Sequence, residues 1–182
     1  MEYVAFGARG LICLIFVVSA FGKVRGRAAF AEFTRTTRIL LGAALRRREV
    51  SRPAATWTGR VVVATEAAAA LLVLFPVTAA AGLGVAALLL GAFSVAMVTA
   101  LRAGVSTSCR CFGASTAPIG WRHVVRNVLL ICAAVAGLVA ASAAGSPPLA
   151  GMVITAGAVA VVALLVIRLD DLYELFVAPN AR

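Results

Sequence analysis

Five long stretches of the sequence are almost wholly apolar, and they constrain the fold more than any other feature. A transmembrane α-helix needs about 20 consecutive apolar residues. The stretches cover residues 3–22, 61–81, 83–101, 124–144 and 149–167. None of them shows the polar and apolar alternation that is typical of membrane β-barrel strands. We therefore expect an all-α protein, a polytopic transmembrane bundle of four or five helices.

The composition of the chain favours lipid over water as its surroundings. Of its 182 residues, 63% are hydrophobic and 13% are charged, and the mean hydropathy is +1.03. Soluble domains are about half apolar and a quarter charged, and a domain of this size leaves much of its surface in water. We expect residues 1–182 to form a single transmembrane domain.

The turns between the apolar stretches are predicted from glycine, proline and the absence of charge. The second and third stretches meet at residues 81–84, which include two glycines and no charge, so we expect a tight helical hairpin there. Residues 145–148 contain one glycine and two prolines and separate the fourth and fifth stretches. Gly151 and Gly157 weaken the fifth stretch, which leaves the choice between four and five spans open.

Basic residues are concentrated in two connections. The net charge is +10, and ten of the 17 Lys and Arg residues lie between positions 23 and 60. Four more lie in or beside the connection between the third and fourth stretches. Their neighbours are mainly Ala, Val and Leu rather than the aromatic and polar residues of a nucleic-acid surface, so we expect no nucleic-acid partner. Basic connections beside apolar spans indicate the cytoplasmic side of a membrane protein.

The first connection is too long for a turn and is predicted to contain an amphipathic helix. Apolar residues alternate there with arginines in helical spacing, which is typical of a helix at the membrane interface. Specific recognition of an anionic lipid or a partner is the alternative. The apolar residues are Phe30, Phe33, Ile39, Leu40 and Leu41, and the basic ones are Arg27, Arg35 and Arg38.

The four cysteines divide into two kinds. Cys13 and Cys132 lie in apolar runs, where a free cysteine usually behaves as a small buried hydrophobe. Cys109 and Cys111 flank Arg110 in a connection rich in Gly, Ser and Thr. A neighbouring cation favours the reactive thiolate, and a disulfide across one residue closes a small, strained ring that exchanges readily.

This loop pair predicts a redox function, with metal binding and accidental proximity as alternatives. A zinc site needs four ligands, whereas the loop offers two cysteines, with His123 some way off. We therefore expect no metal.

Ionisable and amide side chains also lie inside the spans. Glu66 stands within the second apolar stretch, where a charge costs a few kcal/mol. Arg126 and Asn127 lie at similar depth in the fourth stretch, and both stretches enter from the face that carries the cysteine loop. We expect Glu66 and Arg126 to form an ion pair with Asn127 hydrogen-bonded beside it. This group is either structural or a polar floor that moves protons or tunes the thiols. His123 is a candidate proton shuttle or a solvated side chain.

Several short motifs resemble those of one protein family, and they occur along the chain in the same order as in that family. They are Ser-Ala-Phe-Gly-Lys at 19–23, Arg-Ala-Ala-Phe at 27–30, Glu66, Cys-Arg-Cys-Phe-Gly at 109–113 and Trp-Arg-His-Val-Val-Arg-Asn at 121–127. Over about residues 10–140 the sequence resembles the MauE membrane proteins of methylamine utilisation, within the wider DoxX-like group. The segment of residues 34–51 is longer and more basic than the corresponding part of the family pattern. The fifth apolar stretch extends past the end of that pattern.

The resemblance implies a function at the bacterial plasma membrane. It implies a role in disulfide formation during maturation of methylamine dehydrogenase, with Cys109 and Cys111 as the exchanging pair. A thioredoxin-like protein is the implied partner, and a quinone is the electron acceptor by analogy. A non-catalytic anchor or assembly scaffold is the alternative function. A solute transporter with Glu66 and Arg126 along its path is a third, weakened by the scarcity of other polar residues in the spans.

The side of the membrane that the cysteines face is open at this stage. The charge pattern predicts that their loop is cytoplasmic, whereas disulfide maturation of an exported protein requires the oxidising outer side. An arginine-bearing helix at the lipid headgroups would relax the charge rule. Cleavage of the first stretch near Ala20 would do so too, although the sequence before it lacks a basic start.

Overall fold

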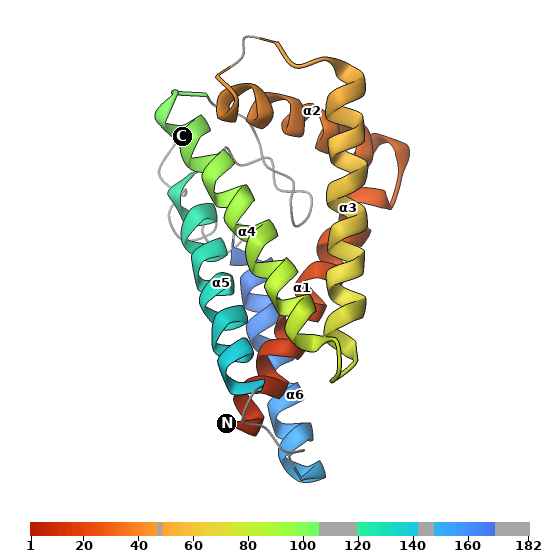
Figure 1. Ribbon diagram of the computed structural model, residues 1–182, viewed down its shortest axis with the longest axis vertical. Helices are drawn as coiled ribbons and strands as arrows, with labels where there is room; N and C mark the ends of the chain where they lie inside the picture. The colour runs from red at the N-terminus through yellow and green to blue at the C-terminus, as the bar shows by residue number, and fades with distance from the viewer. Residues whose placement is uncertain (47–48, 106–119, 142–147, 170–182) are drawn as a thin grey trace, which may run out of the picture.

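A computed structural model describes residues 1–46, 49–105, 120–141 and 148–169, and nearly all of these residues are helical (Figure 1). Within these ranges α1, α3, α4, α5 and α6 are long and apolar enough to cross a membrane. The prediction of an all-α bundle is confirmed, and the fifth apolar stretch is a helix like the others. The helices are α1 (Glu2–Val24), α2 (Arg27–Ala44), α3 (Arg52–Leu74), α4 (Ala79–Arg102), α5 (Trp121–Ala141) and α6 (Leu149–Ile167).

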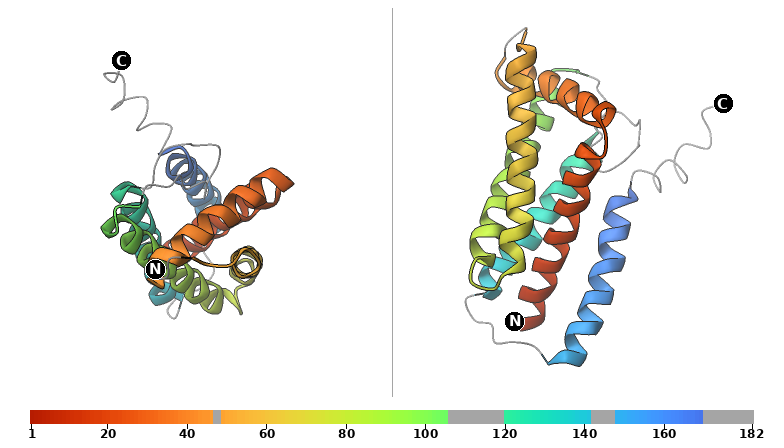
Figure 2. Two further views of the ribbon diagram at one scale, coloured as in Figure 1. Left: turned by 90° about the horizontal axis from the view of Figure 1, so that it is seen from above. Right: turned by 90° about the vertical axis from the view of Figure 1, so that its right-hand side faces the viewer.

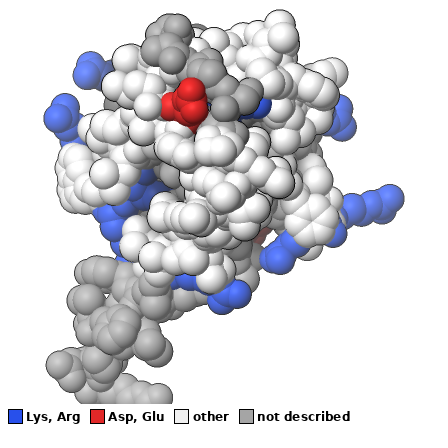
Figure 3. All heavy atoms as spheres, turned by 90° about the horizontal axis from the view of Figure 1, so that it is seen from below, with Lys and Arg blue, Asp and Glu red and all other residues white. Residues whose placement is uncertain are grey.

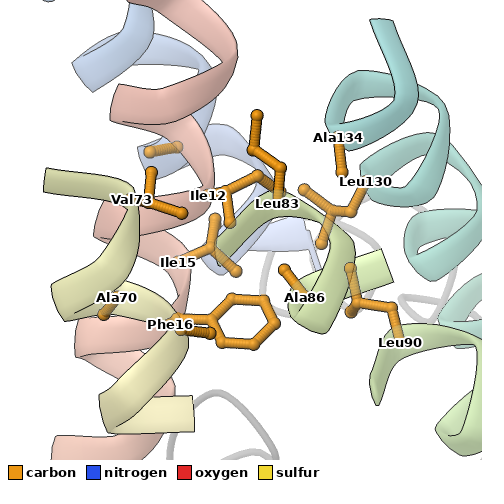
Figure 4. Packing of buried hydrophobic residues seen from close by; sticks show 12 residues of the cluster. Ile12, Ile15, Phe16, Ala70, Val73, Leu83, Ala86, Leu90, Leu130 and Ala134 are labelled. Carbon is orange, nitrogen blue, oxygen red and sulfur yellow. The ribbon is translucent and has the colours of Figure 1, made fainter. Parts of the chain in front are cut away.

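Four of the helices supply most of a common apolar core, and α6 contributes one buried residue to it, Ala163. Side chains from α1, α3, α4 and α5 converge in the middle of the bundle (Figure 4). Ile12 and Leu83 are completely buried there, because small residues such as Ala86 and Ala134 let the helices approach closely. The last helix, α6, packs beside α1, on the side away from α4 (Figure 2). Most of the α6 surface is therefore left for lipid.

The hairpin between α3 and α4 lies earlier in the chain than the sequence suggested. The turn is at residues 75–78, so the prediction of a turn at residues 81–84 is wrong. Pro76 explains the difference, because proline has no backbone N–H and disfavours helical geometry in the residue before it. Phe75 accordingly has an extended ψ of 129°. The Thr78 hydroxyl donates to the Leu72 carbonyl at 2.7 Å and closes the turn.

Gly82 lies inside α4 rather than in a turn, and it has a packing role. A Cβ atom at this position would be 2.6 Å from Val73 Cγ2 and 2.7 Å from the Val73 backbone nitrogen. The absence of a side chain therefore allows α4 to contact the backbone of α3. This contact holds the two arms of the hairpin together.

The helix predicted in the first connection is α2, which lies across one end of the bundle (Figures 1 and 2). It contacts α3 and α4. Phe33 and Leu40 are buried on its inner face, and Leu40 packs against Met97 of α4. Arg27 and Arg35 are exposed. The amphipathic pattern thus gives a helix whose apolar face is covered by the bundle itself.

The two ends of the bundle differ in charge. The end covered by α2 carries the basic residues that flank α2 and begin α3. The opposite end is formed by the chain start, the 75–78 turn and the start of α6, and Figure 3 shows it as mostly uncharged. Of the residues described at that end, only Glu2 and Arg9 are charged. We call these the basic end and the neutral end.

Candidate functional site

A buried cluster of polar side chains joins α1 to α3. Glu66 lies on α3, and Ser19 and Lys23 lie one turn apart on α1. The Lys23 ammonium group donates to both Glu66 carboxylate oxygens, at 2.7 and 2.8 Å, and to Ser19 Oγ at 2.6 Å. The Ser19 hydroxyl donates to Glu66 Oε1 at 3.0 Å. These three residues are called the Lys23–Glu66 cluster below.

Because Lys23 and Glu66 are deeply buried, their charges need the hydrogen bonds that the cluster provides. Lys23 is 1% exposed and Glu66 is 3% exposed. An isolated charge removed from water costs several kcal/mol, and an opposite charge offsets that cost only when the geometry is good and hydrogen bonds satisfy the remaining polar atoms. The pair of short bonds from Lys23, with the hydroxyl of Ser19, meets both conditions. The cluster can therefore exist inside an apolar bundle.

Lys23 also connects the cluster to α2. Its ammonium nitrogen lies 5.1 Å from the centre of the Phe33 ring, a distance at which the ring face attracts a cation. Gly59 of α3 approaches the same ring, since a Cβ atom there would be 3.5 Å from it. One lysine thus contacts groups from α1, α2 and α3 at the basic end.

A small cavity of about 20 Å³ adjoins the cluster. This volume is close to that needed for one water molecule. Arg126 and Asn127 of α5 contribute to its wall, together with apolar side chains of α1 and α4. Its lining residues are Phe16, Ser19, Lys23, Glu66, Leu90, Phe93, Met97, Arg126 and Asn127.

The counter-ion of Glu66 differs from the sequence expectation. Glu66, Arg126 and Asn127 do line one cavity, but the ion pair of Glu66 is formed with Lys23 and not with Arg126. Sequence reasoning assigned Lys23 to the basic connection, because it stands at the end of an apolar stretch. The signal that could have identified it is its spacing of four residues from Ser19, which places both side chains on one helix face.

The first two turns of α5 place three polar side chains inside the bundle. His123, Arg126 and Asn127 are 2%, 4% and 4% exposed. The backbone N–H of Gly120 donates to Nδ1 of His123 at 3.3 Å. The expectation of a solvated His123 is therefore wrong, because helical spacing puts it on the same buried face as Asn127 and Leu130.

The cysteines of the apolar helices are less buried than expected. Cys13 is half-buried, and its thiol lies 3.7 Å from the carbonyl oxygen of Ala70. Cys132 is exposed on the outer surface of α5, so the expectation that it is buried is wrong. Apolar residues of a membrane helix face lipid as readily as the protein interior, and hydropathy alone does not separate the two.

Cys109 and Cys111 lie in the connection between α4 and α5, outside the described residues. That connection leaves α4 after Arg102 and enters α5 at Trp121, and both helix ends are at the basic end. The Lys23–Glu66 cluster and the polar turns of α5 lie in the half of the bundle nearest that end. Within the described part of the chain, no three His, Cys, Asp or Glu side chains gather as metal ligands would.

Residues 1–140 match the family described as methylamine utilisation protein MauE. No curated protein and no solved structure matches the chain. The matched region includes α1 to α4, all but the last residue of α5, the connection with Cys109 and Cys111, and every residue of the Lys23–Glu66 cluster. The chain therefore belongs to the MauE family and is a multi-pass membrane protein.

Proposed function

We propose that the protein is a membrane thiol–disulfide oxidoreductase whose working groups are Cys109 and Cys111. The observation that carries this proposal is the Cys-Arg-Cys sequence, which lies within the region matched to the MauE family and in a connection between two spans. Disulfide exchange requires an accessible thiolate with a second thiol close by. Cys13 and Cys132 lie on different helices within apolar segments and do not offer this arrangement.

The proposed reaction transfers two electrons and two protons. A substrate thiolate attacks one sulfur of the Cys109–Cys111 disulfide and forms a mixed disulfide. A second substrate thiolate then attacks the mixed disulfide, which releases an oxidised substrate and a reduced loop pair. A thioredoxin-like protein disulfide or a membrane quinone takes the two electrons from the pair and restores the loop disulfide. The substrate we propose is a disulfide-containing oxidoreductase such as methylamine dehydrogenase, at the bacterial plasma membrane.

The buried polar residues support the loop pair in this proposal. Glu66, Arg126 and Asn127 line a cavity large enough for one water molecule, and His123 is buried about one turn before Arg126. His123, Arg126 and Asn127 lie in the first two turns of α5, which directly follows the connection of residues 103–120, and Glu66 of α3 lines the same cavity as Arg126 and Asn127. Their proposed role is to hold the ends of α4 and α5 in place beneath the loop and to accept or supply protons during exchange.

Serine substitutions with matched cysteine controls test the proposal. In cells that lack the native copy, Cys109→Ser and Cys111→Ser should each abolish accumulation of the active substrate enzyme while leaving the membrane abundance of this protein unchanged. Each should also trap a partner in a mixed disulfide on a non-reducing gel. Cys13→Ala and Cys132→Ala should preserve activity and trap nothing. If both serine variants keep full activity and trap no partner, the redox proposal fails and a non-catalytic assembly scaffold replaces it.

A further inference from the structure

A second cavity lies at the basic end, away from the Lys23–Glu66 cluster. Its volume is about 760 Å³, and it lies between the last turns of α2, the start of α3 and the residues that follow α4. Ligand pockets usually have volumes of about 300–1,000 Å³. The cavity is therefore large enough for a small molecule or a lipid headgroup.

Arginines dominate the charged groups around this cavity. Arg38, Arg46 and Arg52 line it, and Glu49 is the single acidic residue among its described lining. Within the described chain, none of these three arginine side chains forms a hydrogen bond or an ion pair. Three arginines thus line one cavity, and their guanidinium groups make no bond to the described part of the protein.

Helix ends modify the charge of the cavity without reversing it. The α3 N-terminus, where Ser51 is the N-cap, contributes about half a positive charge. The C-termini of α2 and α4 each contribute about half a negative charge. For the three arginines and one glutamate of the described lining, the sum stays positive by between one and two charges on this reckoning. An anion is therefore favoured in the cavity.

We propose that this cavity binds a phosphate-bearing anion. The planar guanidinium group presents paired N–H donors that match two oxygens of a phosphate, and three such groups can surround one phosphate. Apolar side chains, including Ile39, Val50 and Val105, complete the wall. This mixture of arginine and apolar contacts fits the headgroup and glycerol of an anionic phospholipid, and the same arginines would also hold a soluble phosphate.

The experiment uses the full-length protein in a neutral detergent, so that no charged membrane surface contributes. Native mass spectrometry and thermal unfolding measure the binding of phosphatidylglycerol, phosphatidylcholine and inorganic phosphate. We expect one phosphatidylglycerol to bind in preference to phosphatidylcholine. Stabilisation by inorganic phosphate alone would identify a soluble anion as the ligand, and stabilisation by phosphatidylglycerol alone would identify the lipid. If neither phosphatidylglycerol nor inorganic phosphate binds, the proposal is overturned.

Two triple variants separate a specific site from diffuse attraction. The combined Arg38→Gln, Arg46→Gln and Arg52→Gln variant should bind the anion on the order of 100-fold more weakly, at about fivefold per arginine. The combined Arg25→Gln, Arg27→Gln and Arg35→Gln variant is the control, because it loses the same charge from exposed arginines of the same end that do not line the cavity. The control should lose less than about fivefold. Equal weakening in the two variants would show diffuse attraction and refute the site.

A charge change of opposite sign gives an independent check. Glu49→Gln removes the acidic residue from the cavity wall and should tighten binding of the anion by about fivefold. Circular dichroism and gel filtration of each variant establish that the helical bundle is intact. A Glu49→Gln protein that is folded and binds phosphate-bearing anions more weakly would contradict the proposal.

Discussion

Lys23 and Glu66 form a buried ion pair that links the end of α1 to the middle of α3. The lysine nitrogen lies 2.7 and 2.8 Å from the two carboxylate oxygens, and Ser19 bonds to both partners. Each charge can be buried only because the other is present. Neither could remain ionised alone in an apolar bundle without a large cost in free energy. The pair therefore fixes how α1 and α3 are aligned along their axes near the basic end.

Removing Lys23 should be strongly destabilising. Lys23→Met leaves the Glu66 carboxylate buried without a counter-ion, which is expected to lower the free energy of unfolding by about 3 kcal/mol or more. The double variant with Glu66→Leu should lose much less than the sum of the single losses, since no charge is then stranded. Reversible unfolding in mixed micelles measures the free energies of unfolding from which the cycle is calculated.

A second cycle provides the control for this pair. Arg126→Met combined with Glu66→Leu should give a smaller coupling energy than the Lys23 cycle, because the ion pair of Glu66 is with Lys23. A coupling energy for Arg126 that equals or exceeds that for Lys23 would contradict the assignment of the counter-ion.

Gly82→Ala should destabilise the hairpin of α3 and α4. The new Cβ would meet the Val73 backbone nitrogen at 2.7 Å, and a backbone atom cannot rotate away as a side chain can. We expect a loss of about 1–3 kcal/mol. Gly84→Ala is the matched control, because its added Cβ would have no atom within 4 Å apart from the adjacent residues and the nearby backbone of its own helix. It should be neutral or should stabilise α4 by up to about 1 kcal/mol. Equal effects at the two glycines would argue against the close approach.

Arg9 should stabilise the neutral end by capping α3. Its guanidinium group donates to the carbonyl oxygens of Val73 at 3.1 Å and Leu74 at 2.9 Å, which have no partner within the helix. Arg9→Met should lower the free energy of unfolding by about 1–3 kcal/mol. Arg25→Met removes an exposed arginine and should change it by less than about 0.5 kcal/mol. Full stability of the Arg9 variant would show that the cap contributes nothing.

The charge difference between the ends predicts the orientation of the protein. Basic connections stay in the cytoplasm, so the basic end should be cytoplasmic and the 75–78 turn external. In a cysteine-free background, Val77→Cys should react with an impermeant maleimide in intact cells, since Val77 is 95% exposed. Leu45→Cys should react only after permeabilisation. The reverse pattern would contradict the charge rule and place the cysteine connection on the outer side, which is the side that the proposed disulfide exchange with an exported enzyme requires.

Part of the candidate site could be predicted from the sequence. Glu66, Arg126 and Asn127 stand out because polar groups are rare in apolar spans, and the fold brings them to one cavity. Lys23 was missed because a lysine at the end of an apolar stretch is usually solvated. The exchange chemistry of Cys109 and Cys111 stays a prediction from their spacing and their family.

The sequence by itself determined that the chain is a bundle of membrane-spanning helices, with an amphipathic helix after the first span. Hydropathy and helical spacing are local properties, and a lipid solvent requires each span to satisfy its own backbone hydrogen bonds. Only the tertiary structure decided that Lys23 pairs with Glu66, that Gly82 serves a helix contact and that α6 packs beside α1. These outcomes depend on how each helix is rotated and shifted against its neighbours, which no single stretch of sequence encodes.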